Sequence, residues 1–132
     1  MGDDKVVTGR CLCGAVSYQI TGPITDVHAC HCGQCRRQSG HFVIGGGVRR
    51  SDFELSGAEH ITWYKSSDWA RRGFCSRCGS KLLWDDGGEE VGINVGSLDQ
   101  PTGLKLERHI FVDDKADYYE IDDDLPKVAT YE

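Results

Sequence analysis

The sequence contains no long hydrophobic run and no N-terminal apolar segment. A membrane-spanning helix needs about 20 consecutive apolar residues, and no stretch of the 132-residue sequence approaches that length. The first residues, Met1–Lys5, are mostly polar and charged, unlike a secretory signal peptide. We therefore expect a cytoplasmic protein with no membrane partner.

Positive charge is also in deficit. The net charge of −6 argues against a nucleic-acid partner, because binding to phosphates requires clustered cations. Three arginine pairs stand in the sequence: Arg36-Arg37, Arg49-Arg50 and Arg71-Arg72. They are too few to reverse the charge balance, although a guanidinium can bind one carboxylate of a small substrate. We expect Arg49-Arg50 to be solvated, whereas Arg36 and Arg37 directly follow a cysteine-rich run and are candidate substrate-binding residues.

Proline is scarce, with 3 residues against 17 glycines, and helical periodicity is weak. Short stretches with alternating hydrophobic residues predominate, which is typical of a mainly β domain. We expect strands at 5–10, 15–21, 27–30, 53–55, 61–64, 71–75, 81–84, 91–95 and 107–112, and one in 41–47 that ends in a flexible glycine run. A short helix is expected at 34–38. No linker divides the sequence, so we predict one domain over residues 5–129, with frayed ends at 1–4 and 130–132.

The seven cysteines are an odd number, so disulfide pairing would leave one thiol free. Disulfides are rare in a reducing cytosol. The C-x-C and C-x2-C spacings also suit chelation better than bridging, because a disulfide between such close neighbours closes a strained ring. We therefore predict that the cysteines bind metal, and thiolates in these spacings favour zinc.

The cysteines divide into a contiguous trio and a quartet made of two distant pairs. The trio is Cys30, Cys32 and Cys35, and the quartet is Cys11, Cys13, Cys75 and Cys78. A zinc ion shared by the two pairs of the quartet would join separate hairpins and would be closed by four ligands. Spacing alone also allows the first two cysteines of the trio to pair with the second half of the quartet. Giving the trio to one ion is the more economical arrangement, because a single turn can present all three thiols.

Three hypotheses compete for the cysteine trio. A zinc ion held by three protein ligands keeps a position for water or a thiol substrate, which would make the site catalytic. A histidine such as His28, His31 or His41 could instead close the site and make it structural. We expect His31 to support or pack against the ligands, since adjacent residues seldom bind one ion. The third hypothesis, a redox C-x2-C pair, needs a long helix that the sequence does not offer.

A series of short motifs runs in order over nearly the whole chain. They are Gly9–Val16, Cys30–Arg37 with Ser39-Gly40, Phe74–Ser80, Gly96–Asp99, and His109–Val112 with Lys115 and Tyr118–Ile121. Together they resemble the motifs of the glutathione-dependent formaldehyde-activating enzyme family, which is also the family of centromere protein V. The resemblance implies a β-tent fold, in which two antiparallel sheets pack together and zinc lies at the ends of hairpins.

The resemblance also implies roles for the cysteines and a reaction. The quartet would hold a structural zinc ion, and the trio would hold a catalytic one. The family's named activity joins formaldehyde to glutathione as S-(hydroxymethyl)glutathione, which is formally the reverse of a carbon–sulfur lyase reaction. The thiol would be activated at the open zinc ion, and Arg36 or Arg37 could bind the carboxylates of the tripeptide.

Other chemically capable residues have simpler interpretations. His109 lies in an alternating stretch, where a hydrogen-bonded structural histidine is commoner than a general base. Trp63, Trp69 and Trp84 are expected to pack in the core or at its rim.

The sequence therefore predicts a zinc-dependent enzyme of thiol adduct chemistry, a carbon–sulfur lyase or the related synthase. Its partner would be a small-molecule thiol such as glutathione. The alternative is a non-catalytic, zinc-stabilised module that binds a protein.

Overall fold

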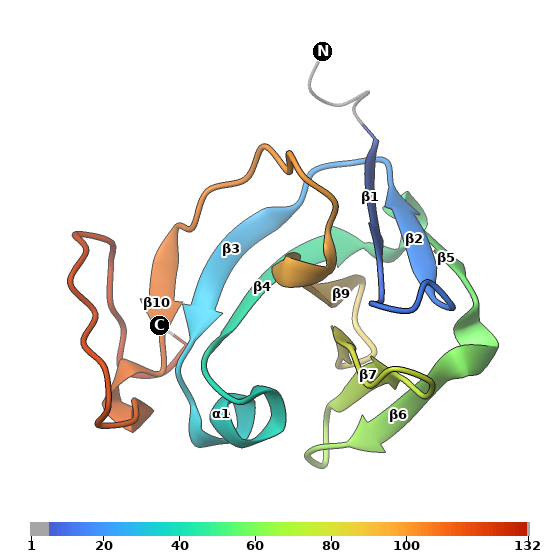
Figure 1. The fold of residues 1–132 in the computed structure, drawn as a ribbon. Helices are drawn as coiled ribbons and strands as arrows, with labels where there is room; N and C mark the ends of the chain where they lie inside the picture. Colours follow the sequence, from blue (N-terminus) through green and yellow to red (C-terminus); the bar gives the residue numbers. More distant parts are fainter. Residues whose placement is uncertain (1–5, 132) are drawn as a thin grey trace.

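The computed structural model of the protein describes residues 6–131, which form two β-sheets and one short α-helix (Figure 1). The small sheet has three antiparallel strands in the order β1-β2-β5. The large sheet has seven strands in the order β10-β3-β4-β9-β8-β7-β6. In Figure 1 the large sheet curves across the molecule and the small sheet lies to its right. The predicted mainly β fold of two sheets is confirmed.

The elements follow one another with short connections. The strands of the small sheet are β1 (Val7–Arg10), β2 (Ser17–Ile20) and β5 (Phe53–Ser56). Those of the large sheet are β3 (Thr25–Cys30), β4 (Val43–Arg49), β6 (Ile61–Lys65), β7 (Arg71–Cys75), β8 (Lys81–Asp85), β9 (Glu90–Asn94) and β10 (Arg108–Ile110). The helix α1 spans Gly33–Ser39, and the short 3₁₀ helices are η2 (Arg50–Asp52), η3 (Ala58–His60), η4 (Val95–Ser97) and η5 (Val112–Asp114).

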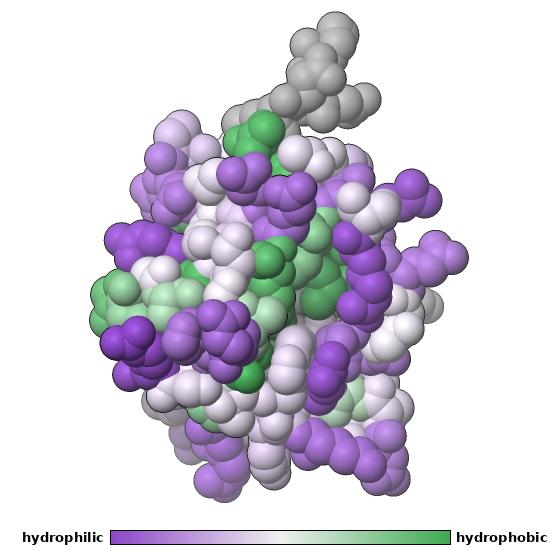
Figure 2. All heavy atoms as spheres, turned by 90° about the vertical axis from the view of Figure 1, so that its right-hand side faces the viewer, coloured by the Kyte–Doolittle hydropathy of each residue, from purple (hydrophilic) through white to green (hydrophobic). Residues whose placement is uncertain are grey.

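The main core lies between the two sheets. In β2, Tyr18 and Ile20 alternate with more exposed residues and are buried, as a period of two requires for a strand covered on one face. They pack with Val48, Leu82 and Ile93 of the large sheet. Figure 2 shows hydrophobic residues between hydrophilic ones on the face at the right of Figure 1. Alternation therefore predicted the strands well, and each predicted strand is present with bounds within two residues of those expected.

The glycine run is where the strand prediction is wrong. Gly45, Gly46 and Gly47 lie inside β4, which pairs with β3 on one side and β9 on the other. Neighbouring side chains approach this strand closely: a Cβ atom at Gly46 would lie 2.8 Å from Cγ2 of Ile24. The glycines therefore permit close packing of a central strand and do not form a flexible loop.

The C-terminal segment also differs from the prediction. β10 pairs with β3 in parallel, so one pairing departs from the expected antiparallel sheets. The backbone N–H of Phe111 donates to the carbonyl of Thr130, and Arg108 Nη1 donates to the carbonyl of Tyr131. Residues 130 and 131 are thus hydrogen-bonded to the β10 segment, and the fraying of 130–132 stays a prediction. Residues 1–4 and 132 lie outside the described residues.

Across residues 6–131, no helix combines the length and the hydropathy that crossing a bilayer would require.

Asp85 connects three segments at the end of β8. Its buried carboxylate accepts hydrogen bonds from Arg50, from Nη2 of Arg71 at 3.1 Å and from the backbone N–H of Gly87 at 2.9 Å. Burial alone would raise the pKa of Asp85, but these donors hold it below its ordinary value. The carboxylate therefore stays ionised and ties η2, β7 and the turn after β8 together.

We predict that Asp85→Ala lowers the free energy of unfolding by about 2 kcal/mol, because it removes a buried acceptor and leaves two guanidinium groups unpaired. The neighbouring Asp86 is exposed, and its side chain accepts from the nearby N–H of Gly88. Asp86→Ala should cost about 0.5 kcal/mol or less. Urea unfolding of both variants is the measurement, and equal losses would contradict the role assigned to Asp85.

Candidate metal centre and active site

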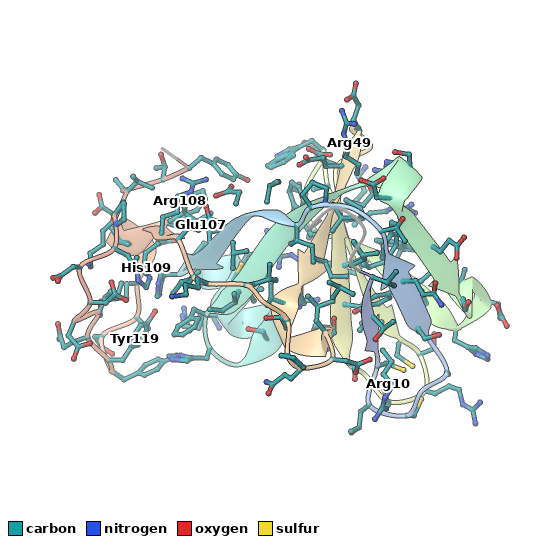
Figure 3. The ribbon with its side chains drawn as sticks, turned by 90° about the horizontal axis from the view of Figure 1, so that it is seen from above. Arg10, Arg49, Glu107, Arg108, His109 and Tyr119 are labelled. Carbon is teal, nitrogen blue, oxygen red and sulfur yellow. The ribbon has the colours of Figure 1, made fainter. Side chains whose placement is uncertain are left out.

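The cysteine quartet lies where the two sheets meet. Its four sulfur atoms are all within 4.8 Å of one another, although they come from the turn after β1 and the turn between β7 and β8. Figure 3 shows sulfur atoms beside the label of Arg10, the last residue of β1. Tetrahedral zinc sites are built from four such thiolates. The predicted pairing of the two distant halves is therefore the one that the fold brings together.

The backbone around the quartet is shaped for sulfur. Gly14 and Gly79, which follow the two pairs of cysteines, have φ angles of 84° and 80°, a region that favours glycine. The N–H of Val16 lies 3.3 Å from Cys11 Sγ. A hydrogen bond from the Ser80 hydroxyl helps to lower the pKa of Cys78 to about 5. These donors stabilise thiolates, the form in which cysteine binds metal.

The cysteine trio lies at the junction of β3 and α1. Its three sulfur atoms are also within 4.8 Å of one another. Cys30 ends β3, and Cys32 is the N-cap of α1, where its sulfur accepts from the N–H of Cys35 at 3.3 Å. Cys30 and Cys35 form a second, smaller core with Ile110, apart from the main core between the sheets. The trio is therefore held by local chain geometry and by β10.

Negative charge is distributed unequally among the three sulfurs of the trio. Hydrogen bonds from Cys30 and Cys35 lower the pKa of Cys32 to about 2, and the same contacts raise the pKa of Cys30. One sulfur of the group thus carries charge while its neighbours donate to it. Such a compact set of soft donors fits a zinc ion.

Within residues 6–131, no histidine nitrogen or carboxylate oxygen joins the trio as a fourth donor. His28 Nδ1 contacts the carbonyl of Asp26 at 2.7 Å, and His41 Nδ1 lies 2.9 Å from the hydroxyl of Tyr118. His31 points into a buried network: its Nδ1 bonds the hydroxyl of Tyr119. The three histidines considered as closing ligands are therefore engaged elsewhere through these atoms.

The network behind the trio continues through β10. His31 Nε2 lies 2.9 Å from Nδ1 of His109, whose Nε2 contacts Asp123 Oδ2 at 2.9 Å. Figure 3 shows His109 and Tyr119 on the same side of the molecule. Burial, with a contribution from His109, lowers the pKa of His31 to about 4, so the ring is neutral at pH 7. The geometry agrees with the expected supporting role of His31 and the expected hydrogen-bonded role of His109.

A cavity of about 490 Å³ opens beside the trio, and Cys30, Cys32 and Cys35 all line it. Its floor is one face of the large sheet, and it also receives residues from α1, the β6–β7 loop and the C-terminal segment. A second cavity of about 620 Å³ lies on the other side, against Arg10 and Cys11 of the quartet region, and none of the trio lines it. The cavity beside the trio is therefore the candidate active site.

Arg72 is a candidate site residue that the sequence analysis did not single out. It is 9% exposed, and its Nη1 and Nη2 atoms lie 3.7 and 3.6 Å from Cys35 Sγ. The side-chain oxygen of Gln34 accepts from Nε at 3.1 Å and from Nη2 at 2.8 Å. The signal was strand alternation in β7, where Arg71 faces outward to Asp85 and Arg72 must therefore face the cavity.

His28, which the sequence offered only as a possible fourth ligand of the trio, also lines the cavity. It lies on β3 two positions before Cys30, so the two side chains share one face of the strand. A carbonyl oxygen only accepts, so Nδ1 carries the proton in the bond to Asp26, and Nε2 is left as the acceptor atom of the neutral ring. A Cβ atom at Gly45 would lie 3.6 Å from Nε2, which puts this nitrogen over the cavity floor.

The two arginines predicted to bind substrate lie farther along α1. Arg36 is half-buried and Arg37 is exposed, and neither is among the residues that line the cavity. Their substrate role stays a prediction.

Known proteins resemble this chain in sequence and in structure. The family model described as glutathione-dependent formaldehyde-activating enzyme matches residues 6–114. A Schizosaccharomyces pombe protein named as an uncharacterized lyase is 28% identical over 115 residues, which cover 85% of this chain and 82% of that protein. A crystal structure of a Rhodobacter sphaeroides protein superposes with a TM-score of 0.59 at 31% identity, covering 74% of this chain and 90% of that one.

The two cysteine groups should respond differently to substitution. We predict that the purified chain binds two zinc ions and that Cys32→Ala binds one while remaining folded, because the trio belongs to the smaller core. Cys75→Ala should unfold the chain or lower its melting temperature by more than about 10 °C, since Cys75 is fully buried in the main core. Zinc analysis and thermal unfolding measure both effects. Unfolding of Cys32→Ala to the same extent would contradict the division.

Proposed function

Because this chain belongs to the glutathione-dependent formaldehyde-activating enzyme family, we propose that it is a zinc-dependent enzyme that adds a thiol to a small carbonyl compound or reverses that addition. In the forward direction the sulfur bonds to the carbonyl carbon, the C=O π bond opens, and the thiol proton ends on the oxygen. With glutathione and formaldehyde the product is S-(hydroxymethyl)glutathione. The reverse direction breaks the carbon–sulfur bond and is a lyase reaction.

One observation carries the proposal: three thiols, with no fourth donor among residues 6–131, line a cavity large enough for a substrate. A closed structural site would have four ligands. Zinc bound by the trio would supply a Lewis acid that favours the deprotonated, nucleophilic form of a substrate thiol. The chain itself holds the sulfurs in place through α1 and β3 and limits the approach of water by burying Cys30 and Cys35.

Arg72 supports this function electrostatically. Three thiolates around one divalent cation leave a net negative charge, which opposes binding of a further thiolate. The guanidinium of Arg72, next to Cys35 Sγ, offsets part of that charge inside a poorly solvated site. We infer that Arg72 lets the site accept an anionic sulfur at neutral pH.

His28 supplies a place for the proton of the reaction. Its Nε2 is the free acceptor of a ring that lines the cavity and whose other nitrogen donates to Asp26. A base in this position takes the thiol proton and returns it to the developing alkoxide oxygen. Arg36 and Arg37 remain candidates for binding substrate carboxylates as the substrate extends out of the cavity.

The direct test follows the condensation of glutathione with ¹³C-formaldehyde by NMR at neutral pH. We expect the zinc-loaded chain to accelerate the appearance of S-(hydroxymethyl)glutathione over the uncatalysed rate. Cys32→Ala, or the wild-type chain after selective removal of an ion bound at the trio, should return the rate to the uncatalysed value. A folded chain with two equally inert ions and no acceleration would favour the alternative, a zinc-stabilised module that binds a protein.

A second prediction concerns the proton. His28→Gln should lower kcat/KM by about 100-fold, the usual contribution of a positioned acid–base group. The zinc content should not change. His41→Gln is the matched control, because His41 contacts Tyr118 and does not line the cavity. If both variants keep kcat/KM within about twofold of wild type, the proton is transferred at another group or to water.

A further inference from the structure

The cavity beside the trio is larger than the reacting groups of the proposed reaction require. At about 490 Å³, its volume falls within the range of pockets that enclose drug-sized ligands. A one-carbon carbonyl compound and the sulfur that attacks it would occupy only the part beside the cysteines. The remaining space is left for the non-reacting part of the substrate, and the residues that line it indicate the chemistry of that part.

Aromatic rings line that remaining space. Four rings from different segments belong to the cavity wall: Trp69, Trp84, Phe111 and Tyr131. They contact one another in series, with ring centroids 5.5 Å apart for Trp84 and Trp69, 6.4 Å for Trp69 and Tyr131, and 4.8 Å for Tyr131 and Phe111. We call these four residues the aromatic wall.

The aromatic wall has unused apolar surface. Trp69 is 55% exposed and Tyr131 is 49% exposed. Single exposed apolar residues are ordinary on protein surfaces, but two that adjoin inside one cavity form a contiguous patch. The edge-to-face contacts, at interplanar angles of 64° to 76°, hold the rings in position. An apolar group placed against them would bury this surface without requiring them to reorganise.

Two glycines lie on the floor of the cavity. Gly45 and Gly92 both line it. A Cβ atom at Gly45 would meet only ordinary contacts, the closest at 3.6 Å, so a side chain there would project into the cavity. A Cβ atom at Gly92 would lie 3.2 Å from the Cβ of Trp84. Gly45 thus leaves space on the cavity floor, whereas Gly92 permits the close approach of Trp84.

The charged groups at this end of the cavity are engaged with one another. Arg108 donates from Nε and Nη2 to the two carboxylate oxygens of Asp26 at 2.8 and 2.9 Å. Arg72, the cross-strand register partner of Trp84, is engaged with Cys35 and Gln34. The ring surface of the aromatic wall is therefore suited to an apolar group.

We propose that the thiol substrate or thiol–carbonyl adduct of this protein carries an aromatic ring, or an apolar group of that size, which binds against the aromatic wall while its sulfur lies at the trio. This inference rests on the proposed function for the sulfur and on the wall for the ring. It differs from the expectation that Trp69 and Trp84 serve only packing. Trp84 and Phe111 form the inner part of the wall, and Trp69 and Tyr131 form its edge.

The test measures binding to the zinc-loaded, full-length chain by isothermal titration calorimetry. Three probes separate the sulfur from the ring: benzyl mercaptan has both, 2-mercaptoethanol has only the thiol, and benzyl alcohol has only the ring. We expect benzyl mercaptan to bind at least about tenfold more tightly than 2-mercaptoethanol, because burying one ring is worth that factor or more.

Two variants locate the effect. Trp69→Ala should weaken the binding of benzyl mercaptan about fivefold or more and leave the affinity for 2-mercaptoethanol unchanged. Gly45→Val places a side chain above the cavity floor and should weaken the binding of benzyl mercaptan by a similar factor. The control is Tyr64→Ala, which removes an aromatic residue that is 61% exposed and does not line the cavity. Thermal unfolding and zinc content verify that each variant is folded and loaded.

The outcomes distinguish this inference from the proposed function. Equal affinity for the two thiols, with no effect of Trp69→Ala, would overturn the inference and leave the thiol chemistry intact. Equal affinity for benzyl alcohol and benzyl mercaptan, with both lost in Trp69→Ala, would support the aromatic wall and count against a thiol at the trio. Tight binding of benzyl mercaptan that Tyr64→Ala weakens as much as Trp69→Ala would also overturn the inference.

Discussion

The convergence of the four quartet sulfurs is the constraint on which this structure depends. Cys11 and Cys13 belong to the small sheet's first turn, and Cys75 and Cys78 to a turn of the large sheet, yet their sulfurs lie within 4.8 Å. Both sheets must therefore have a fixed relative position before the thiols can meet. Cys11 and Cys75 are at the same time members of the main hydrophobic core. A metal ion bound by the quartet would favour the same arrangement as core packing, so each would strengthen the other.

The trio is organised on a different principle. Its sulfurs come from one short stretch, so local geometry brings them together, and the neighbouring elements only need to hold that stretch still. The parallel pairing of β10 with β3 does this from one side. The buried contacts of His31 with Tyr119 and His109 do it from behind. A site supported in this way can leave one side facing a cavity, whereas the quartet is assembled from turns of both sheets.

The sequence predicted those features that depend on local pattern. Alternation gave the strands. The spacing of the cysteines left two divisions open, and the economy of giving one ion the three thiols of a single turn selected the division into trio and quartet. What it missed depends on which residues become neighbours across the sheet. Arg72 reaches Cys35 only because β7 and α1 face the same cavity. Gly45–Gly47 look like a flexible loop until β3 and β9 are paired on both sides of them. The hydrogen bonds that position residues 130 and 131 beside β10 likewise join distant parts of the chain, so no local pattern reveals them.

The return of the last described residues to β10 has a consequence for how such a protein can diversify. Tyr131 contributes to the cavity from the very end of the described chain, while the sulfurs are fixed by elements near the start and the middle. A mutation in this tail would change the lining of the cavity without altering the cysteines that could hold an ion. Substrate selectivity and ion binding would then depend on different parts of the chain. Mutations during evolution could change the first with little effect on the second.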